Sequence, residues 1–238
     1  MTNNYYEELL KFKHKVLEYT QNAFRYYRNE LELKLEDYNL LSADNNCIET
    51  STSIGFILEE FIVSKLNNFT AALPKSINDY YIERLPNTVA TIASSYDCFS
   101  YLNDSILGLI NIKVCKNGAN NNAVAAINQL YKDYTALRST KKCFMVLKIH
   151  YDFIGKAELR KINILNIEAY YLEEIDFSKE KHHQDSRNWS KKFDANSGRL
   201  VISDAFRKRN QMEHKYISYE TTLKQLYDII NANKSASN

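Results

Sequence analysis

Apolar residues recur at intervals of three and four over the first forty residues of the chain. The series runs through Leu9, Phe12, Val16, Phe24 and Leu31. This spacing places the apolar side chains on one face of a helix, so it predicts a long amphipathic helix, or a pair of helices, from Tyr5 to about Leu41.

A second apolar run, from Ile54 to Leu66, follows three hydroxyl residues at 51–53. Hydroxyl side chains accept hydrogen bonds from the first backbone amides of a helix, so they predict a helix start there. This predicted helix contains two adjacent acids, Glu59 and Glu60, inside a strongly apolar segment. We expect at least one of them to face solvent.

Two arms rich in aromatic, β-branched and aliphatic residues, 96–102 and 106–116, flank a short Asn-Asp-Ser turn. This pattern predicts two adjacent strands. Asn111 and Lys113 are two residues apart on the second arm, so their side chains project from the same face. Because a buried charge is costly without a partner, Lys113 requires one, and Asp97 at the start of the first arm is the nearest candidate.

The remaining pattern predicts a helix from Ala123 to about Leu137, strands over 143–151 and 159–172, and a C-terminal helix over 219–230. Segment 67–93 is expected to form loops with a short helix or strand, and 176–206 a loop-rich attachment. Strands interleaved with a crossover helix indicate an α/β (α+β) fold, with a central mixed β-sheet flanked by helices. We expect a single domain over 1–238, with a helical N-terminal part over about 1–50, a core over about 51–172 and an attachment over about 173–238.

Composition narrows the class of protein only slightly. With 238 residues, 45% of them hydrophobic, the chain can build a sizeable core, whereas a net charge of +2 does not by itself indicate a polyanionic partner. No apolar run is long enough to cross a bilayer and no signal pattern opens the chain, so we expect a cytoplasmic protein without a membrane partner. The four cysteines show neither metal spacing nor CxxC pairs, and are expected to be buried free thiols: Cys47, Cys98, Cys115 and Cys143.

The candidate chemistry lies in a helix-borne acid, an acid that opens one strand and a polar-x-Lys pair on the next strand. Carboxylate oxygens suit a hard ion such as Mg²⁺, which can activate a bound water. A lysine beside that water can orient it and offset charge that develops on a phosphate. The set Glu59, Asp97, Asn111 and Lys113 therefore fits metal-dependent phosphodiester hydrolysis.

Asp97 followed by Asn111-Ile112-Lys113 resembles the Asp…(Asp/Glu)-x-Lys signature of the PD-(D/E)xK nuclease superfamily, and Gly55-x-x-x-Glu59 is similar to its helix-borne glutamate. The order helix, strand, strand, helix, strand over about 51–172 matches the common core of that superfamily. The chain size and the Asn-rich loop after the lysine strand look most like a type II restriction endonuclease.

This resemblance implies Mg²⁺-dependent cleavage of duplex DNA at a short specific sequence. It implies that Glu59, Asp97 and Asn111 are metal ligands, that Lys113 lies at the attacking water, and that the protein is a homodimer. A repair or junction-resolving nuclease is an alternative, as is a non-catalytic DNA-binding protein in which Asp97 and Lys113 form a structural ion pair.

Position 111 departs from the signature, because these nucleases usually place a second acid where this chain has asparagine. An amide oxygen can bind Mg²⁺ but brings no negative charge. Three interpretations stay open: a natural variant pattern in which Glu59 or Glu60 supplies the charge, an inactivated Asp-to-Asn variant, or a misplaced motif. Helical spacing does not choose between the two glutamates, although the offset from Gly55 favours Glu59.

Candidate DNA contacts flank this core. Lys116 and Asn120-Asn121-Asn122 leave the lysine strand and could meet a phosphate or a base edge, although an Asn-rich turn can equally cap a helix. Basic residues of the C-terminal attachment could track phosphates or form a solvated basic loop: Arg187, Lys191, Lys192 and Arg199. The adjacent His182 and His183 give only a weak metal signal without further ligand spacing.

Overall fold

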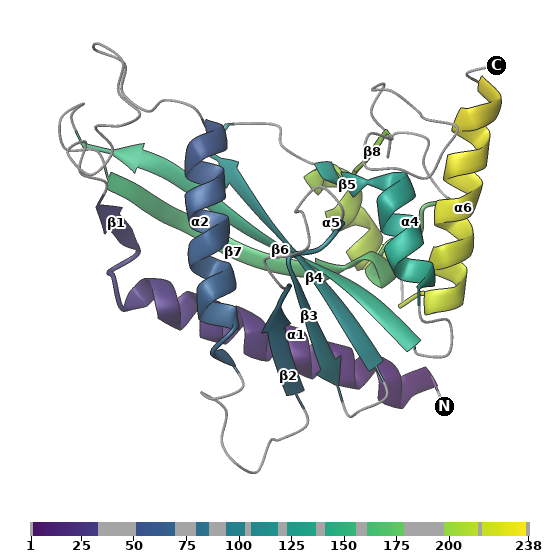
Figure 1. The fold of residues 1–238 in the computed structure, drawn as a ribbon, viewed down its shortest axis with the longest axis horizontal. Coiled ribbons are helices and arrows are strands. Elements are labelled where there is room, and N and C mark those ends of the chain that lie inside the picture. The colour runs from purple at the N-terminus through teal and green to yellow at the C-terminus, as the bar shows by residue number, and fades with distance from the viewer. Residues whose placement is uncertain are drawn as a thin grey trace.

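The computed structural model describes residues 2–32, 51–69, 80–85, 94–102, 106–118, 123–136, 141–155, 161–178, 198–213 and 216–236. Its centre is a six-stranded sheet in the order β1-β7-β6-β4-β3-β2, beside a two-stranded sheet, β5-β8 (Figure 1). The strands are β1 (Glu30–Glu32), β2 (Tyr80–Arg84), β3 (Cys98–Leu102), β4 (Ile106–Lys116), β5 (Ala123–Ala126), β6 (Lys141–Ile154), β7 (Lys161–Tyr171) and β8 (Arg199–Val201). The helices are α1 (Thr2–Arg25), α2 (Ser51–Leu66), α4 (Ile127–Thr135), α5 (Asp204–Glu213) and α6 (Tyr219–Ala236), with a short 3₁₀ turn, η4 (Leu172–Glu174).

The predicted fold class is confirmed, because the central sheet is mixed and helices flank it. β4 and β6 are parallel neighbours, and the chain between them passes through β5 and α4. The other pairings in the central sheet are antiparallel. A parallel pair requires such a crossover, so the helix predicted between the two strands is what makes the sheet mixed.

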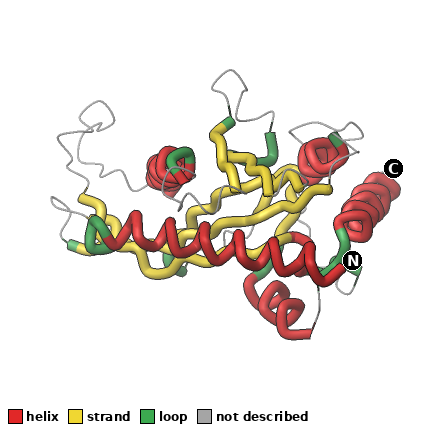
Figure 2. Tube along the Cα trace, turned by 90° about the horizontal axis from the view of Figure 1, so that it is seen from below, coloured by secondary structure: helices red, strands yellow, loops and turns green. Residues whose placement is uncertain are grey.

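Two apolar cores cover the two faces of the sheet. One joins α1 and α2 to side chains such as Ile110, Ile112 and Leu147. The other joins α4, α5 and α6 to side chains such as Leu109 and Val146. Figure 2 shows α1 running along the length of the sheet. Since β4 and β6 carry buried apolar side chains on both faces, these two strands form the centre of the molecule.

The N-terminal prediction is wrong in its extent. The first helix ends at Arg25, and Arg28 and Asn29 adopt positive φ angles of 56° and 60° in the turn that follows. This left-handed turn sends the chain back as β1, which pairs with β7. The second helix begins at Ser51, so the hydroxyl residues expected to precede it form its first turn.

The strands of the hairpin are confirmed at 98–102 and 106–116, and the predicted strands over 143–151 and 159–172 appear as β6 and β7. The helix predicted from Ala123 is wrong over its first turn, because Ala123–Ala126 form β5 and pair with β8. The attachment is more ordered than predicted, since it contributes β8 and α5. Within segment 67–93, where loops with a short helix or strand were expected, Tyr80–Arg84 form the strand β2.

Three of the four cysteines lie in the described residues, and the structure confirms that Cys98, Cys115 and Cys143 are buried free thiols. Cys47 lies outside the described residues.

Gly108 on β4 faces a crowded site. A Cβ added there would collide with the Ser100 Oγ and lie 3.3 Å from the Leu102 Cδ1. We expect Gly108→Ala to lower the free energy of unfolding by about 1–3 kcal/mol, and a second change, Ser100→Ala, to recover much of it. Urea unfolding of the single and double variants measures both effects.

The matched control is Gly55→Ala on α2, where an added Cβ meets nothing within 4 Å. It should raise the free energy of unfolding by about 0.5–1 kcal/mol, because alanine has the higher helix propensity. Equal destabilisation by both changes would contradict the proposed crowding at Gly108.

Candidate active site

The candidate site begins where β3 leaves the edge of β4. The last register pair is Cys98 with Ile110, so beyond this point β4 lacks β3 as its neighbour. Asp97 takes over the pairing: its backbone amide donates to the Ile110 carbonyl at 2.8 Å, and its Oδ2 accepts from the Ile112 amide at 2.7 Å. The strand edge therefore fixes the Asp97 carboxylate beside the polar end of β4, while no described residue donates a hydrogen bond to its Oδ1.

Asn111 and Lys113 project from the same face of β4, as predicted from their spacing. Asn111 is only 4% exposed, and its Nδ2 donates to the Ser95 carbonyl at 2.5 Å. The other end of this side chain, Oδ1, is buried without a hydrogen-bond partner among the described residues. Since a buried acceptor without a donor is costly, this atom is suited to a ligand.

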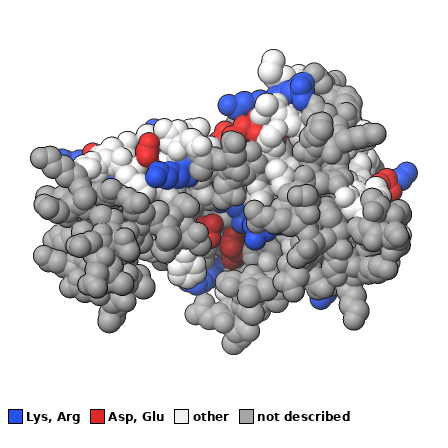
Figure 3. Space-filling view, turned by 90° about the horizontal axis from the view of Figure 1, so that it is seen from above, with Lys and Arg blue, Asp and Glu red and all other residues white. Residues whose placement is uncertain are grey.

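These side chains open into one cavity of about 450 Å³. Four elements or segments wall it: α2, the 94–97 segment, β4 and the β5–α4 region, with Arg199 of β8 at its margin. Its lining includes all four residues proposed from the sequence, namely Glu59, Asp97, Asn111 and Lys113. Figure 3 shows acidic and basic side chains meeting in a hollow on one face of the molecule.

The geometry distinguishes the two glutamates of α2, although both line the cavity. Glu60 is paired with Arg84, whose NH2 lies 2.8 Å from its Oε2, with both side chains 37% exposed. Burial raises the pKa of Glu59 to about 7; the Lys113 ammonium opposes this rise, and the carboxylates of Asp97 and Glu60 add to it. Both glutamates therefore lie near Asp97, and Glu59 is the better candidate for the helix-borne acid, because it forms no ion pair with a described residue whereas Glu60 pairs with Arg84.

Burial also raises the pKa of Asp97, against the opposing effects of the Lys113 charge and the hydrogen bond from the Ile112 amide, and the Glu60 carboxylate adds to the rise. Two carboxyl groups with raised pKa values beside one lysine form a site in which negative charge is under-compensated. Such a site gains from a bound cation, because the ion offsets the desolvation and the mutual repulsion of the carboxylates.

Ser95 and Gln129 also line the cavity, and the sequence singled out neither of them nor Asp133, to which both donate hydrogen bonds. Ser95 donates from its backbone amide and from its Oγ to the Asp133 Oδ2, both at 2.7 Å, and Gln129 donates to the Asp133 Oδ1 at 2.8 Å. Gln129 and Asp133 are one helical turn apart on α4. Their i, i+4 spacing was visible in the sequence, but nothing there indicated that the turn would face Ser95.

Of the predicted DNA contacts, only Lys116 and Arg199 lie in the described residues. Arg199 is exposed and lines the cavity. Lys116 does not line it, and its Nζ lies 5.1 Å from the centre of the Phe153 ring. The remaining predicted contacts lie outside the described residues: Asn120, Asn121, Asn122, Arg187, Lys191 and Lys192. The histidine pair His182-His183 also lies outside them.

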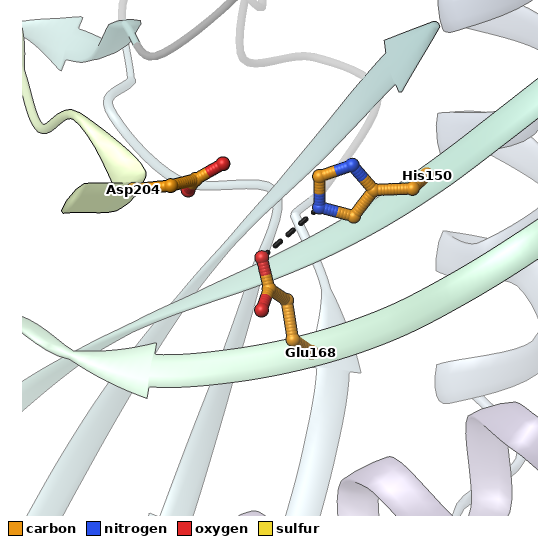
Figure 4. A group of neighbouring side chains, drawn as sticks. All are labelled: His150, Glu168 and Asp204. Carbon is orange, nitrogen blue, oxygen red and sulfur yellow. Dashed lines mark hydrogen bonds and ion pairs between the residues drawn. The ribbon is translucent and has the colours of Figure 1, made fainter. Parts of the chain in front are cut away.

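A second polar group lies on the same face of the sheet, formed by His150, Glu168 and Asp204 (Figure 4). One ligand atom from each lies within 4.8 Å of the others, a spacing that could hold a metal ion. However, Lys148 and Arg207, each with a side chain 5% exposed, contact these carboxylates: Lys148 at 2.9 Å from Asp204 and Arg207 at 2.8 Å from Glu168. Two buried cations already balance two carboxylates, so we interpret the group as an ion-pair network.

The pKa values agree with this interpretation. The hydrogen bond from His150 lowers the pKa of Glu168 to about 2, with burial opposing and the Arg207 charge assisting. Burial acts to raise the pKa of Asp204, but the hydrogen bond and charge of Lys148 and the charge of Arg207 outweigh it, so the pKa is lowered. Neighbours within the protein thus favour the ionised form of both carboxylates, whereas burial disfavours the ionised form of Glu59 and Asp97.

No protein-family model matches the chain, and no curated protein sequence matches it. Among the helices that the structure describes, none combines the length and apolar character needed to span a bilayer.

The raised pKa of Glu59 predicts that cation binding depends on pH. A divalent cation requires the ionised carboxylate, so binding below a pKa of about 7 must release a proton. We expect the affinity for Mg²⁺ or Mn²⁺ to fall by roughly tenfold per pH unit below pH 7, measured by isothermal titration calorimetry between pH 5.5 and 8. Glu59→Gln should weaken binding and flatten this dependence; an unchanged affinity of the wild-type protein across the range would contradict the assignment.

The ion-pair network predicts a separate effect at acid pH. The pKa of Glu168 is about 2 in the folded protein against an ordinary value of 4.5, so its stabilisation is complete above pH 4.5 and is lost as the pH falls towards 2. We expect Glu168→Gln to remove about 1–3 kcal/mol of the acid-induced loss in unfolding free energy, measured by urea unfolding at pH 2.5–7. The exposed Glu18 in the interior of α1 supplies the control, since Glu18→Gln should change the pH profile much less than Glu168→Gln does. A pH profile of Glu168→Gln that matches the wild type would exclude the network as its source.

Proposed function

We propose that this protein is a Mg²⁺-dependent endonuclease that hydrolyses phosphodiester bonds in duplex DNA, of the type II restriction class within the PD-(D/E)xK superfamily. One observation carries the proposal. Glu59, Asp97, Asn111 and Lys113, chosen from the sequence for their chemistry, line a single cavity although they come from α2, the segment before β3 and β4. A structural ion pair between Asp97 and Lys113 would not require Glu59 and Asn111 beside it.

The residues of the cavity fit the cation that the resemblance implies. Oxygen atoms of Glu59, Asp97 and Asn111 are the donors that Mg²⁺ prefers, and the buried Asn111 Oδ1 lacks a hydrogen-bond donor in the described part of the chain. When bound, Mg²⁺ would supply a water of lowered pKa and a positive charge beside the scissile phosphate.

The side chains of the protein supply the remaining requirements. Lys113 presents an ammonium within the cavity, where it can orient the attacking water and stabilise negative charge on the phosphate. Arg199, exposed at the margin, can contact a neighbouring phosphate of the backbone. Glu59, with a pKa of about 7, is partly protonated at neutral pH and becomes a ligand as it loses its proton.

The restriction class further implies that the protein works as a homodimer in the cytoplasm. A palindromic site presents the same sequence to two copies related by a two-fold axis, and each copy would cut one strand. Sedimentation of the protein with and without a DNA duplex would measure the number of copies bound.

Cleavage of plasmid DNA in the presence of Mg²⁺ or Mn²⁺ tests the proposal. We expect discrete fragments from the wild-type protein, and at least about a 100-fold loss of cleavage rate for Asp97→Ala, Glu59→Gln and Lys113→Ala, because each removes a group that acts in the transition state. The exposed residues Lys132 on α4 and Glu220 on α6 provide controls, and their alanine variants should cut at the wild-type rate.

The products separate the alternatives. Smearing without discrete fragments would indicate a nuclease without sequence preference, such as a repair or junction-resolving enzyme. DNA binding without cleavage under any of these conditions would overturn the catalytic proposal.

A further inference from the structure

Asn111 makes a hydrogen bond that an aspartate cannot make. Its Nδ2 donates to the Ser95 carbonyl at 2.5 Å, while its Oδ1 stays buried without a donor in the described part of the chain. The side chain is 4% exposed, so it cannot rotate freely away from these neighbours. A carboxylate at position 111 would place an acceptor oxygen against the Ser95 carbonyl oxygen, and two acceptors at this distance repel.

Ser95 is held from its other side by α4. Its backbone amide and its Oγ both donate to the Asp133 Oδ2 at 2.7 Å. The Gln129 Nε2 donates to the other oxygen of this carboxylate, the Asp133 Oδ1. Ser95 is 3% exposed. One buried residue therefore receives hydrogen bonds from β4 at its carbonyl and donates them to α4 at its amide and hydroxyl.

This arrangement bears on Asp97, two residues further along the same segment. The Asp97 backbone amide and carboxylate are fixed to Ile110 and Ile112 of β4. Asn111 and Asp133 fix the preceding turn of the segment, so the direction in which the Asp97 carboxylate enters the cavity depends on both. Small displacements of such a group have large effects on a reacting centre.

We propose that asparagine is the working residue at position 111, with its amide nitrogen positioning the Ser95–Asp97 segment and its amide oxygen facing the cation. Asp133 is a second positioning residue, acting on the same segment from α4. The catalytic part of this inference rests on the proposed nuclease function. If asparagine is the working residue, Asn111 is not an inactivating replacement of aspartate.

Asn111→Asp is the direct test. Restoring the acid of the superfamily signature removes the hydrogen bond to the Ser95 carbonyl. We expect a fall in Tm of about 2–6 °C without added cation, and at least about a tenfold lower kcat at saturating Mn²⁺ with KM for DNA changed less than about twofold. A higher cleavage rate, or a Tm without added cation equal to or above that of the wild type, would overturn the proposal.

Asp133 is tested through a pair of variants. Asp133→Ala removes every acceptor for Ser95 and should lower kcat about tenfold at saturating Mn²⁺, again with little change in KM. Asp133→Asn keeps one oxygen for the Ser95 amide and should recover a substantial part of this loss. The exposed neighbour Lys132, changed to alanine, is the matched control on the same helix. An Asp133→Ala protein with wild-type kcat, or equal losses in both variants, would contradict the positioning role.

The same measurements separate this inference from the proposed function. Failure of the wild-type protein to cut any DNA would overturn the nuclease proposal, and the comparison of Tm without added cation would still decide the role of Asn111. An Asn111→Asp protein that is equally or more stable without added cation would then overturn the hydrogen-bonding role.

Discussion

The candidate site depends on the divergence of β3 from β4 after the Cys98–Ile110 pair. An exposed strand edge has unpaired amides, and each must find an acceptor. Here the Asp97 carboxylate accepts from the Ile112 amide, so the requirement for backbone hydrogen bonding and the placement of a cavity-facing acid are met by one residue. The cavity exists because β3 does not continue along β4, and α2 and α4 wall the space beside its edge.

The two polar groups on this face of the sheet differ in how their charge is balanced. In the group around Glu168 and Asp204, buried Lys148 and Arg207 neutralise the carboxylates, and the pKa values are lowered. In the cavity, Glu59 and Asp97 share Lys113, and the pKa values are raised. The balanced charges around Glu168 and Asp204 stabilise the fold. In the cavity, two carboxyl groups with raised pKa values share one lysine and would be stabilised by a further positive charge, which is characteristic of a binding site.

The sequence predicted the parts of this arrangement that depend on local pattern. Alternation along β4 placed Asn111 and Lys113 on one face, and the crossover helix implied a mixed sheet. The sequence could not show that Glu60 pairs with Arg84, because that contact joins α2 to β2 through the tertiary fold. The sequence also did not indicate Asp133, because its hydrogen bond to Ser95 depends on the packing of α4 against the 94–97 segment. It did not predict β5 either, because the three alanines and one valine of Ala123–Ala126 fit a helix as well as a strand, and only the pairing with β8 decides between them.

Lys113 and Lys148 are register partners on adjacent parallel strands, about 4.8 Å apart in the sheet, and both project from the same face. Asp204, the first residue of α5, accepts hydrogen bonds from the Lys148 ammonium at 2.9 and 3.2 Å. Detachment of α5 would remove the Asp204 carboxylate from the Lys148 ammonium and would make the electrostatic potential beside Lys113 more positive. The C-terminal part of the chain, which carries no recognisable signature, thereby contributes to the charge around Lys113.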